Sequence, residues 1–160
     1  MGISLSEFWG NNYYKHPSLT NEMIQFAQES FDIKLPALLI DLLKIQNGGY
    51  TQGFVFPMNR RTSWSANHVP FDSLSGIVTD PSIKTAQNIL DTEYMIKEWD
   101  LPEKQVLLTG DGHWWITLDY RNGVNPTVCW IDVDSEEDIE LAASFEDFFN
   151  GLVPESEFEL

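Results

Sequence analysis

The chain has 160 residues, the usual length of one domain, and 42% of them are hydrophobic. Six Trp, five Tyr and ten Phe exclude a disordered chain, and no apolar run approaches the ~20 residues that cross a bilayer. The formal net charge of −16 disfavours direct binding to nucleic acid or to an anionic membrane, and it favours a basic protein partner.

The negative charge is concentrated near the C-terminus. Residues 122–160 contain no Lys or Arg and carry −11, whereas residues 1–121 carry −5. The N-terminal residues have no basic stretch followed by a long apolar run, and Cys129 has no second cysteine with which to form an internal disulfide. We therefore expect a cytoplasmic protein.

Two helices are predicted in the first third of the chain. Thr20 is a suitable N-cap for a helix from Asn21 to Ser30, in which apolar residues recur at helical spacing. A second helix is predicted to begin at Leu35-Pro36, because proline at the first helical position loses no intrahelical hydrogen bond. Asn47-Gly48-Gly49 ends it with residues that tolerate left-handed backbone.

The middle of the chain is less regular. Residues 54–56 read as a short strand, residues 59–68 form a polar loop with the Arg60-Arg61 pair, and residues 69–78 hold strand pieces. Asp80-Pro81 opens a helical pattern that runs toward Trp99, as one helix or two.

A β-hairpin is predicted from Val106 to Tyr120, with its turn at Gly110-Asp111-Gly112. Strand alternation places Trp114, Ile116, Leu118 and Tyr120 on a face that should meet the core. The opposite face would carry His113, Trp115, Thr117 and Asp119, and we expect it to meet a partner.

Residues 127–133 read as the next strand, with the apolar side chains of Cys129, Ile131 and Val133 toward the core. Trp130 and Asp132 would then lie on the other face, like Trp115 and Asp119. The acidic run from Asp134 to Glu140 is predicted to be a loop. The predicted partner-binding residues are Trp115, Asp119, Trp130, Asp132, Asp134, Glu136, Glu137 and Asp138.

A final short helix is predicted after Ser144, where Phe145 begins an apolar i, i+3, i+4, i+7 pattern. The acidic tail 153–160 should be frayed.

Several of these segments, in this order, resemble the SUKH superfamily. The resemblance is carried by Leu35-Pro36 before a leucine-rich helix that ends at Asn47-Gly48-Gly49, and by Leu108-Thr109-Gly110-Asp111-Gly112-His113. It continues with Leu118-Asp119 in the following strand and with Ser144-Phe145 at the last helix, so it covers about residues 8–152. The chain departs from the usual pattern at His113-Trp114-Trp115, where many members have further glycine.

The resemblance implies an α+β fold: a single domain over residues 1–160 with a mainly antiparallel β-sheet flanked by N-terminal helices, a middle helix and a short C-terminal helix. The superfamily is named for a yeast cell-wall-assembly regulator, and many bacterial members are similar to immunity proteins. Such proteins bind a polymorphic toxin, often a nuclease or a deaminase. The implied partner is a basic toxin domain. The alternative is a regulatory or scaffold module that binds an endogenous protein.

An enzyme using Asp111 and His113 is the least favoured alternative, because Asp111 stands where a turn favours aspartate. Cys129 lies within an apolar strand and reads as a small buried hydrophobe rather than a nucleophile. The sequence has no nucleophile elbow, no phosphate-binding loop and no zinc-ligand spacing, and we expect no cofactor and no metal.

Overall fold

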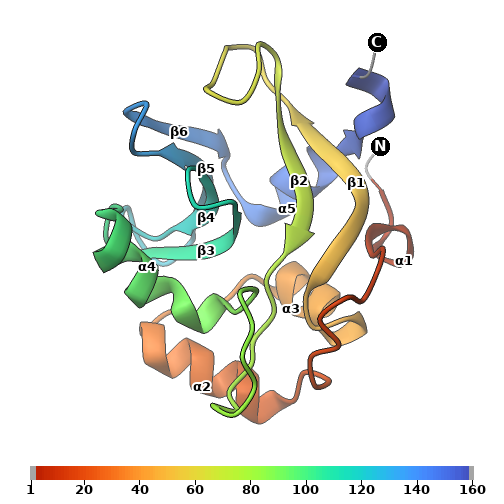
Figure 1. The fold of residues 1–160 in the computed structure, drawn as a ribbon, viewed down its shortest axis with the longest axis vertical. Helices are drawn as coiled ribbons and strands as arrows, with labels where there is room; N and C mark the ends of the chain where they lie inside the picture. The colour runs from red at the N-terminus through yellow and green to blue at the C-terminus, as the bar shows by residue number, and fades with distance from the viewer. Residues whose placement is uncertain (1–2, 159–160) are drawn as a thin grey trace.

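Two antiparallel sheets form the centre of the molecule (Figure 1). The structure is a computed structural model, and it describes residues 3–158. The first sheet has the strand order β2-β1-β7, and the second has the order β3-β4-β5-β6. The strands are β1 (Gly49–Pro57), β2 (His68–Leu74), β3 (Gln105–Gly110), β4 (Trp115–Asp119), β5 (Thr127–Asp132), β6 (Glu137–Ala142) and β7 (Val153–Pro154).

Helices surround the sheets and also separate them. In Figure 1, α2 and α3 lie below the sheets, α4 lies beside the second sheet, and α5 runs between the two sheets. One short 3₁₀ turn, η1, leads into α4, and the other, η2, is the last element of the described chain. The helical elements are α1 (Leu5–Phe8), α2 (Asn21–Phe31), α3 (Ala37–Ile45), η1 (Ile89–Asp91), α4 (Thr92–Trp99), α5 (Phe145–Gly151) and η2 (Glu155–Phe158).

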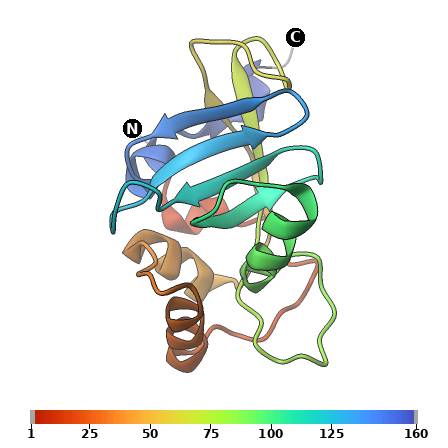
Figure 2. The same ribbon diagram turned by 90° about the vertical axis from the view of Figure 1, so that its left-hand side faces the viewer.

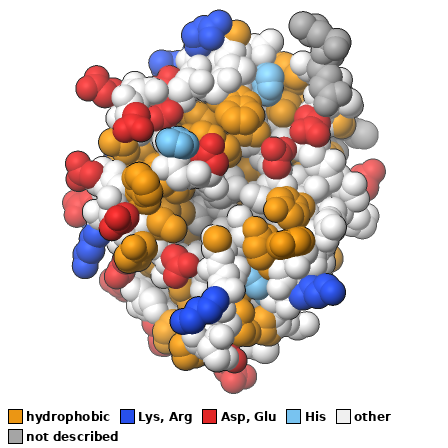
Figure 3. All heavy atoms as spheres, viewed as in Figure 1, with side chains coloured by type: hydrophobic (Ala, Val, Ile, Leu, Met, Phe, Trp, Pro, Cys, Tyr) orange, Lys and Arg blue, Asp and Glu red, His pale blue; other side chains and the backbone are white. Residues whose placement is uncertain are grey.

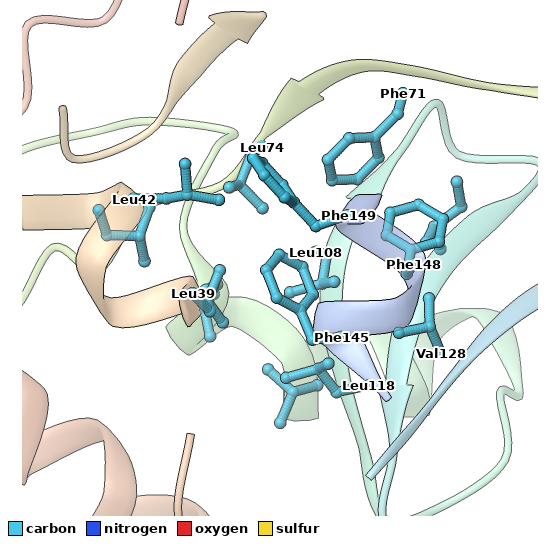
Figure 4. Packing of buried hydrophobic residues seen from close by; sticks show 14 of the residues in the cluster. Leu39, Leu42, Phe71, Leu74, Leu108, Leu118, Val128, Phe145, Phe148 and Phe149 are labelled. Atoms are coloured by element: carbon cyan, nitrogen blue, oxygen red, sulfur yellow. The ribbon is translucent and has the colours of Figure 1, made fainter. Parts of the chain in front are cut away.

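The main core lies where α3 and α5 meet the inner faces of both sheets. Figure 4 shows leucines of α3 and phenylalanines of α5 pointing at side chains of β2, β3, β4 and β5. The backbone joins the sheets directly, since the Ser75 N–H donates to the Leu108 carbonyl (2.8 Å). The labelled core residues are Leu39, Leu42, Phe71, Leu74, Leu108, Leu118, Val128, Phe145, Phe148 and Phe149.

A second, smaller core lies on the other face of the second sheet. There α4 lies in front of β3 near one end of the sheet, as Figure 2 shows. The helix contributes Met95 and Ile96, which are partly buried. The buried residues of this cluster are Leu101, Leu107, Trp115, Cys129 and Ile131.

The structure is an α+β single domain, so the predicted fold class is confirmed. The first predicted helix is present with Thr20 as its cap, because the Thr20 hydroxyl accepts the Met23 N–H (3.2 Å). The second follows Pro36, and the 106–120 hairpin has the predicted antiparallel pairing.

The helix predicted from Asp80-Pro81 is wrong in its first half. Residues 81–88 are not helical, and the helix begins with η1 at Ile89. The Asn88 side chain explains the late start: it bonds both the N–H (3.1 Å) and the carbonyl (2.9 Å) of Val78, and it accepts the Leu90 N–H (3.1 Å). Tertiary hydrogen bonds therefore override the local helical pattern.

Two other predictions about the acidic C-terminal third are also wrong. Only residues 133–136 form a turn, and the rest of the predicted loop is strand β6, because Ile139 is buried opposite Trp130. Residues 153–158 are not frayed: Val153 pairs with Val55 of β1, and η2 follows. Residues 159–160 of the predicted frayed tail lie outside the described residues.

Candidate partner-binding surface

The predicted common face for Trp115 and Trp130 is wrong. In the antiparallel pairing of β4 with β5, Trp115 lies opposite Ile131, and Trp130 lies opposite Ile116. Residues directly opposite each other point to the same face of a sheet. The two tryptophans therefore point to opposite faces, and Trp130 shares its face with the main core.

Both tryptophans are also buried. Trp130 is 0% exposed and Trp115 is 5% exposed, so neither can anchor a partner. The Trp115 face is covered by α4, whose Trp99 ring lies 6.2 Å from the Trp115 ring between centroids. The prediction failed because alternation within one strand does not reveal that a helix covers the second face.

Asp119 is buried and is held by neighbouring side chains. Its carboxylate accepts hydrogen bonds from Gln105 Nε2 (2.8 Å) and from the backbone and side chain of Arg121 (2.9 Å each). Burial raises the pKa of Asp119, but these hydrogen bonds outweigh it and leave the pKa below its usual value. Asp119 is thus a charged structural group beneath Arg121.

Arg121 also takes up one of the predicted surface carboxylates. Its guanidinium makes two hydrogen bonds to Asp138, at 2.7 and 2.8 Å. Arg121 therefore bridges β4 and β6 across the strand between them. Because Asp138 is paired in this way, it contributes less net negative charge than the sequence suggests.

Asp132 and Glu137 are occupied by a loop rather than free for a partner. The Ser63 hydroxyl donates to Asp132 (2.5 Å), and the Ser63 N–H donates to Glu137 Oε1 (2.9 Å). Trp130 Nε1 donates to the same Glu137 oxygen (2.9 Å). These bonds fix loop 58–67 against the two ends of the turn at 133–136.

Asp134 and Glu136 remain exposed, as predicted, on that turn. Within residues 3–158 neither side chain has a hydrogen bond or an ion pair, since the two salt bridges found there both belong to Arg121. Glu136 has a positive φ of 56°, an uncommon conformation for a residue with a side chain. In Figure 3, acidic side chains gather at the upper left, where Figure 1 shows the β5–β6 turn.

An exposed tryptophan lies beside this turn, and the sequence reasoning missed it. Trp64 follows Ser63 directly and is 46% exposed. Its ring packs edge-on against Trp114 (centroids 5.7 Å apart), which stacks on buried Trp130 (4.9 Å). The signal was an aromatic residue within an otherwise polar loop. We call the exposed set Trp64, Val133, Asp134 and Glu136 the Trp64 surface.

Trp114 beneath Trp64 has an unmatched polar atom. Its Nε1 is buried and has no hydrogen-bond partner in the structure. A buried donor without an acceptor costs about 1–3 kcal/mol.

The Arg60-Arg61 pair does not bridge to the acidic turn. Both residues are exposed on loop 58–67, and neither forms a salt bridge within the described part of the chain. Ser63 makes the connection to the turn instead. The loop therefore carries two basic side chains next to an acidic surface.

A second exposed aromatic group lies at the start of β1. The rings of Tyr13, Tyr14 and Tyr50 contact one another at centroid distances of 5.1 to 6.0 Å. Tyr13 is 65% exposed and Tyr50 is 40% exposed.

An open groove of about 1720 Å³ lies between α2, α4 and the turn 120–126. Its walls mix both signs of charge, with Lys34, Lys97 and Arg121 among the basic side chains and Glu29 and Glu93 among the acidic ones. No histidine or cysteine lines it. The mixed charge gives the groove no preference for a basic partner.

Asp111 and His113 are exposed, and within residues 3–158 their side chains do not form a hydrogen bond with each other. Asp111 Oδ1 accepts the N–H groups of His113 (2.9 Å) and Trp114 (3.2 Å), and so closes the hairpin turn. No hydrogen bond of the His113 ring is found within residues 3–158. Burial raises the pKa of the Cys129 thiol to about 11, which leaves it protonated and unreactive at neutral pH.

The other residues of the superfamily resemblance serve packing and caps. Gly110 lies against Trp115, where an added Cβ would approach the ring to 2.4 Å. The Ser144 hydroxyl caps α5 by accepting the Asp147 N–H (3.0 Å). Gly48 and Gly49 have positive φ, and Leu35, Leu118 and Phe145 are buried in the main core.

Within the described residues, no helix combines the length and the apolar composition needed to cross a membrane.

Comparison with known proteins gives two findings. The family described as SMI1 / KNR4 family (SUKH-1) matches residues 18–151. The chain is also 29% identical over 143 residues to a protein named "Probable beta-galactosidase B" from Sclerotinia sclerotiorum, a match that covers 76% of this chain. The chain spans only 13% of that protein's length, so the name describes a much larger molecule.

Proposed function

Because the chain belongs to the SMI1 / KNR4 family (SUKH-1), we propose that it is a protein-binding domain and, more specifically, an immunity protein that neutralises a basic toxin domain. Binding would be stoichiometric and non-enzymatic, and it would use the Trp64 surface. A nuclease or deaminase toxin needs a basic surface to bind nucleic acid. An acidic protein that covers this surface would exclude the substrate.

The observation that carries the proposal is an exposed tryptophan fixed beside unpaired carboxylates. Trp64 offers a large aromatic contact, and aromatic anchors supply much of the energy in protein interfaces. Asp134 and Glu136 add charge that speeds the approach of a basic partner. The hydrogen bonds of Ser63 hold the two parts together before binding, which lowers the entropy cost of association.

The first experiment is a pull-down from source cells with two tagged variants of equal net charge. The surface variant is Asp134→Asn/Glu136→Gln, and the control is Glu22→Gln/Asp41→Asn, which removes two exposed acids on α2 and α3. We expect the wild type and the control to recover a basic toxin domain at a near one-to-one ratio. The surface variant should recover much less, and equal recovery by both variants contradicts the proposed surface.

With a purified partner, the electrostatic part is measured as an association rate. Raising the salt concentration from ~0.05 M to ~0.5 M should slow association of the wild type about tenfold or more. Trp64→Ala should instead raise the dissociation rate, because it removes buried contact rather than charge. A salt-independent association rate would exclude steering by the acidic turn.

The alternative is a regulatory or scaffold module that binds an endogenous protein. The match to a segment of a fungal protein favours this reading, because toxin neutralisation is the role implied for bacterial members. The same pull-down separates the two, since a housekeeping or envelope protein would then be recovered in place of a toxin. A toxicity assay also separates them. If the protein is an immunity protein, its co-expression with the recovered toxin domain should protect the cells.

A further inference from the structure

Strand β6 is an open edge of the second sheet. It pairs with β5 on one side and has no strand on the other side within the described residues. Within the described residues, the hydrogen bonds of loop 58–67 to this strand involve only its first residue, through the bond of Ser63 to Glu137. The backbone groups of residues 138–142 that point away from β5 have no backbone partner in the described chain.

An open edge is a template for another strand, and proteins usually protect it. Here Asp138 and Glu140 are exposed on the strand, while Ile139 between them is buried. Like charges directly opposite each other destabilise paired strands. The edge of a second copy of this chain would bring the same acids face to face, so the charges oppose self-association.

The same charges favour a strand of opposite sign. Residues 122–160 contain no Lys or Arg, and Arg121 beside this strand is paired with both Asp119 and Asp138. Glu140 has no ion pair within residues 3–158. Asp134 and Glu136 extend the acidic surface past one end of the strand.

We propose that β6 takes part in partner recognition by strand addition, in which an extended Lys- or Arg-rich segment of the partner pairs with residues 138–142. The sheet β3-β4-β5-β6 would then gain a fifth strand. Main-chain hydrogen bonds supply the binding, and side chains on alternate positions supply the selectivity. The basic character of the partner rests on the proposed function, whereas pairing at this edge is a separate claim.

The test uses peptides of alternating lysine and threonine, roughly eight residues long, enough to span the open part of β6. Two isomers each carry three N-methyl groups, one on lysines and the other on threonines, so their charges are equal. Successive N–H groups of a strand point to opposite edges, so only one isomer loses the N–H groups that face β6. We expect that isomer to bind at least about tenfold more weakly than the other, because several main-chain hydrogen bonds are lost.

The binding site on the protein is located by adding the unmethylated peptide and measuring amide NMR shifts and hydrogen exchange of the protein. We expect amides of residues 138–142 to shift and to exchange more slowly. Glu140→Gln should weaken binding several-fold, and the control Glu146→Gln, which removes an exposed acid on α5, should not.

Three results overturn the proposal: equal binding of the two methylated isomers, no binding of the unmethylated peptide, or changes confined to residues 133–136. If a toxin is recovered by the wild type through the Trp64 surface and β6 amides are unchanged in that complex, strand addition fails while the proposed function stands. If the wild type recovers a housekeeping or envelope protein in place of a toxin but the isomers differ, the edge binds strands and the immunity role fails.

Discussion

The side chain of Asn47, a residue of the family motif, holds separate parts of the fold together. It is 5% exposed, and its amide Nδ2 donates to the carbonyls of Pro17 and Ile77 (2.8 Å each). Its Oδ1 accepts the Ile77 N–H (2.8 Å). Asn47 thus joins the end of α3 to two distant segments. Gly76 fits against it, since an added Cβ there would approach the Asn47 carbonyl oxygen to 2.1 Å.

Asn47→Ala should therefore lower the free energy of unfolding by about 3 kcal/mol, because backbone groups that stay buried lose their partners. Urea unfolding followed by tryptophan fluorescence measures the change. Asn47→Asp retains the acceptor but turns a carboxylate oxygen toward the carbonyls of Pro17 and Ile77, so at neutral pH it should be at least as destabilising as the alanine variant. A loss below about 0.5 kcal/mol for the alanine variant would mean that water replaces the side chain.

The hairpin β3–β4 is also held by a residue of the family motif. Asp111 closes its turn through two backbone N–H groups, and Gly112 has φ of 99°, which few other residues adopt. The strands beyond the turn fill both cores, with Ile116 on one face and Trp115 on the other. Asp111 thus has a structural role in closing the hairpin turn.

Asp111→Ala should destabilise the protein by about 1 kcal/mol, as loss of a comparable helix-capping side chain does. His113→Ala should stay within about 0.5 kcal/mol of the wild type, because the ring is exposed and makes no described hydrogen bond. Thermal unfolding of both variants beside the wild type measures the difference. Equal effects would assign His113 a contact that the structure does not contain.

The C-terminal segment 153–158 packs on the first sheet. Phe158 of η2 lies against His68, with ring centroids 4.7 Å apart, and Glu155 lies over Gly53 of β1. The pKa of Asp72 is raised, first by burial and then by the nearby Glu155 carboxylate. At neutral pH this segment therefore brings two carboxylates together in a molecule that already carries −16.

Asp72→Asn should stabilise the protein at neutral pH and should have little effect in acid. A folded-state pKa above the unfolded value of about 3.9 means that the stabilising effect of the bound proton is complete below that value. It is lost as the pH rises through the folded-state pKa, and asparagine imitates the protonated form. Between pH 3.5 and 7.5, the Tm of the variant should exceed that of the wild type by an amount that grows as the pH rises.

A constant difference in Tm across that range would contradict this account. Glu157→Gln on the same segment is the matched control, since it removes one charge without a described contact to Asp72. It should produce a smaller change in Tm than Asp72→Asn at pH 7.5.

Local patterns were sufficient to predict most of the elements. Thr20 predicted the start of α2, and Gly110-Asp111-Gly112 predicted the central turn, because caps and turns depend on a few neighbouring residues. Strand β6 was missed, since its acidic residues favour a loop and only the burial of Ile139 against Trp130 reveals it. The acidic turn with Asp134 and Glu136 was predicted to be exposed, and it is.

The order of most elements and the acidity of the C-terminal third could be predicted from composition and near-neighbour spacing, and the resemblance to the SUKH superfamily implied the α+β class. Which tryptophans are exposed could not be predicted from the sequence, and in the structure they are Trp64 and Trp99, each 46% exposed. The register of β4 on β5 sends Trp115 and Trp130 to opposite faces, and Ser63 brings Trp64 to the acidic turn across about 70 residues of sequence. Register, cover by α4 and loop attachment are long-range pairings, and alternation within one strand contains no information about them.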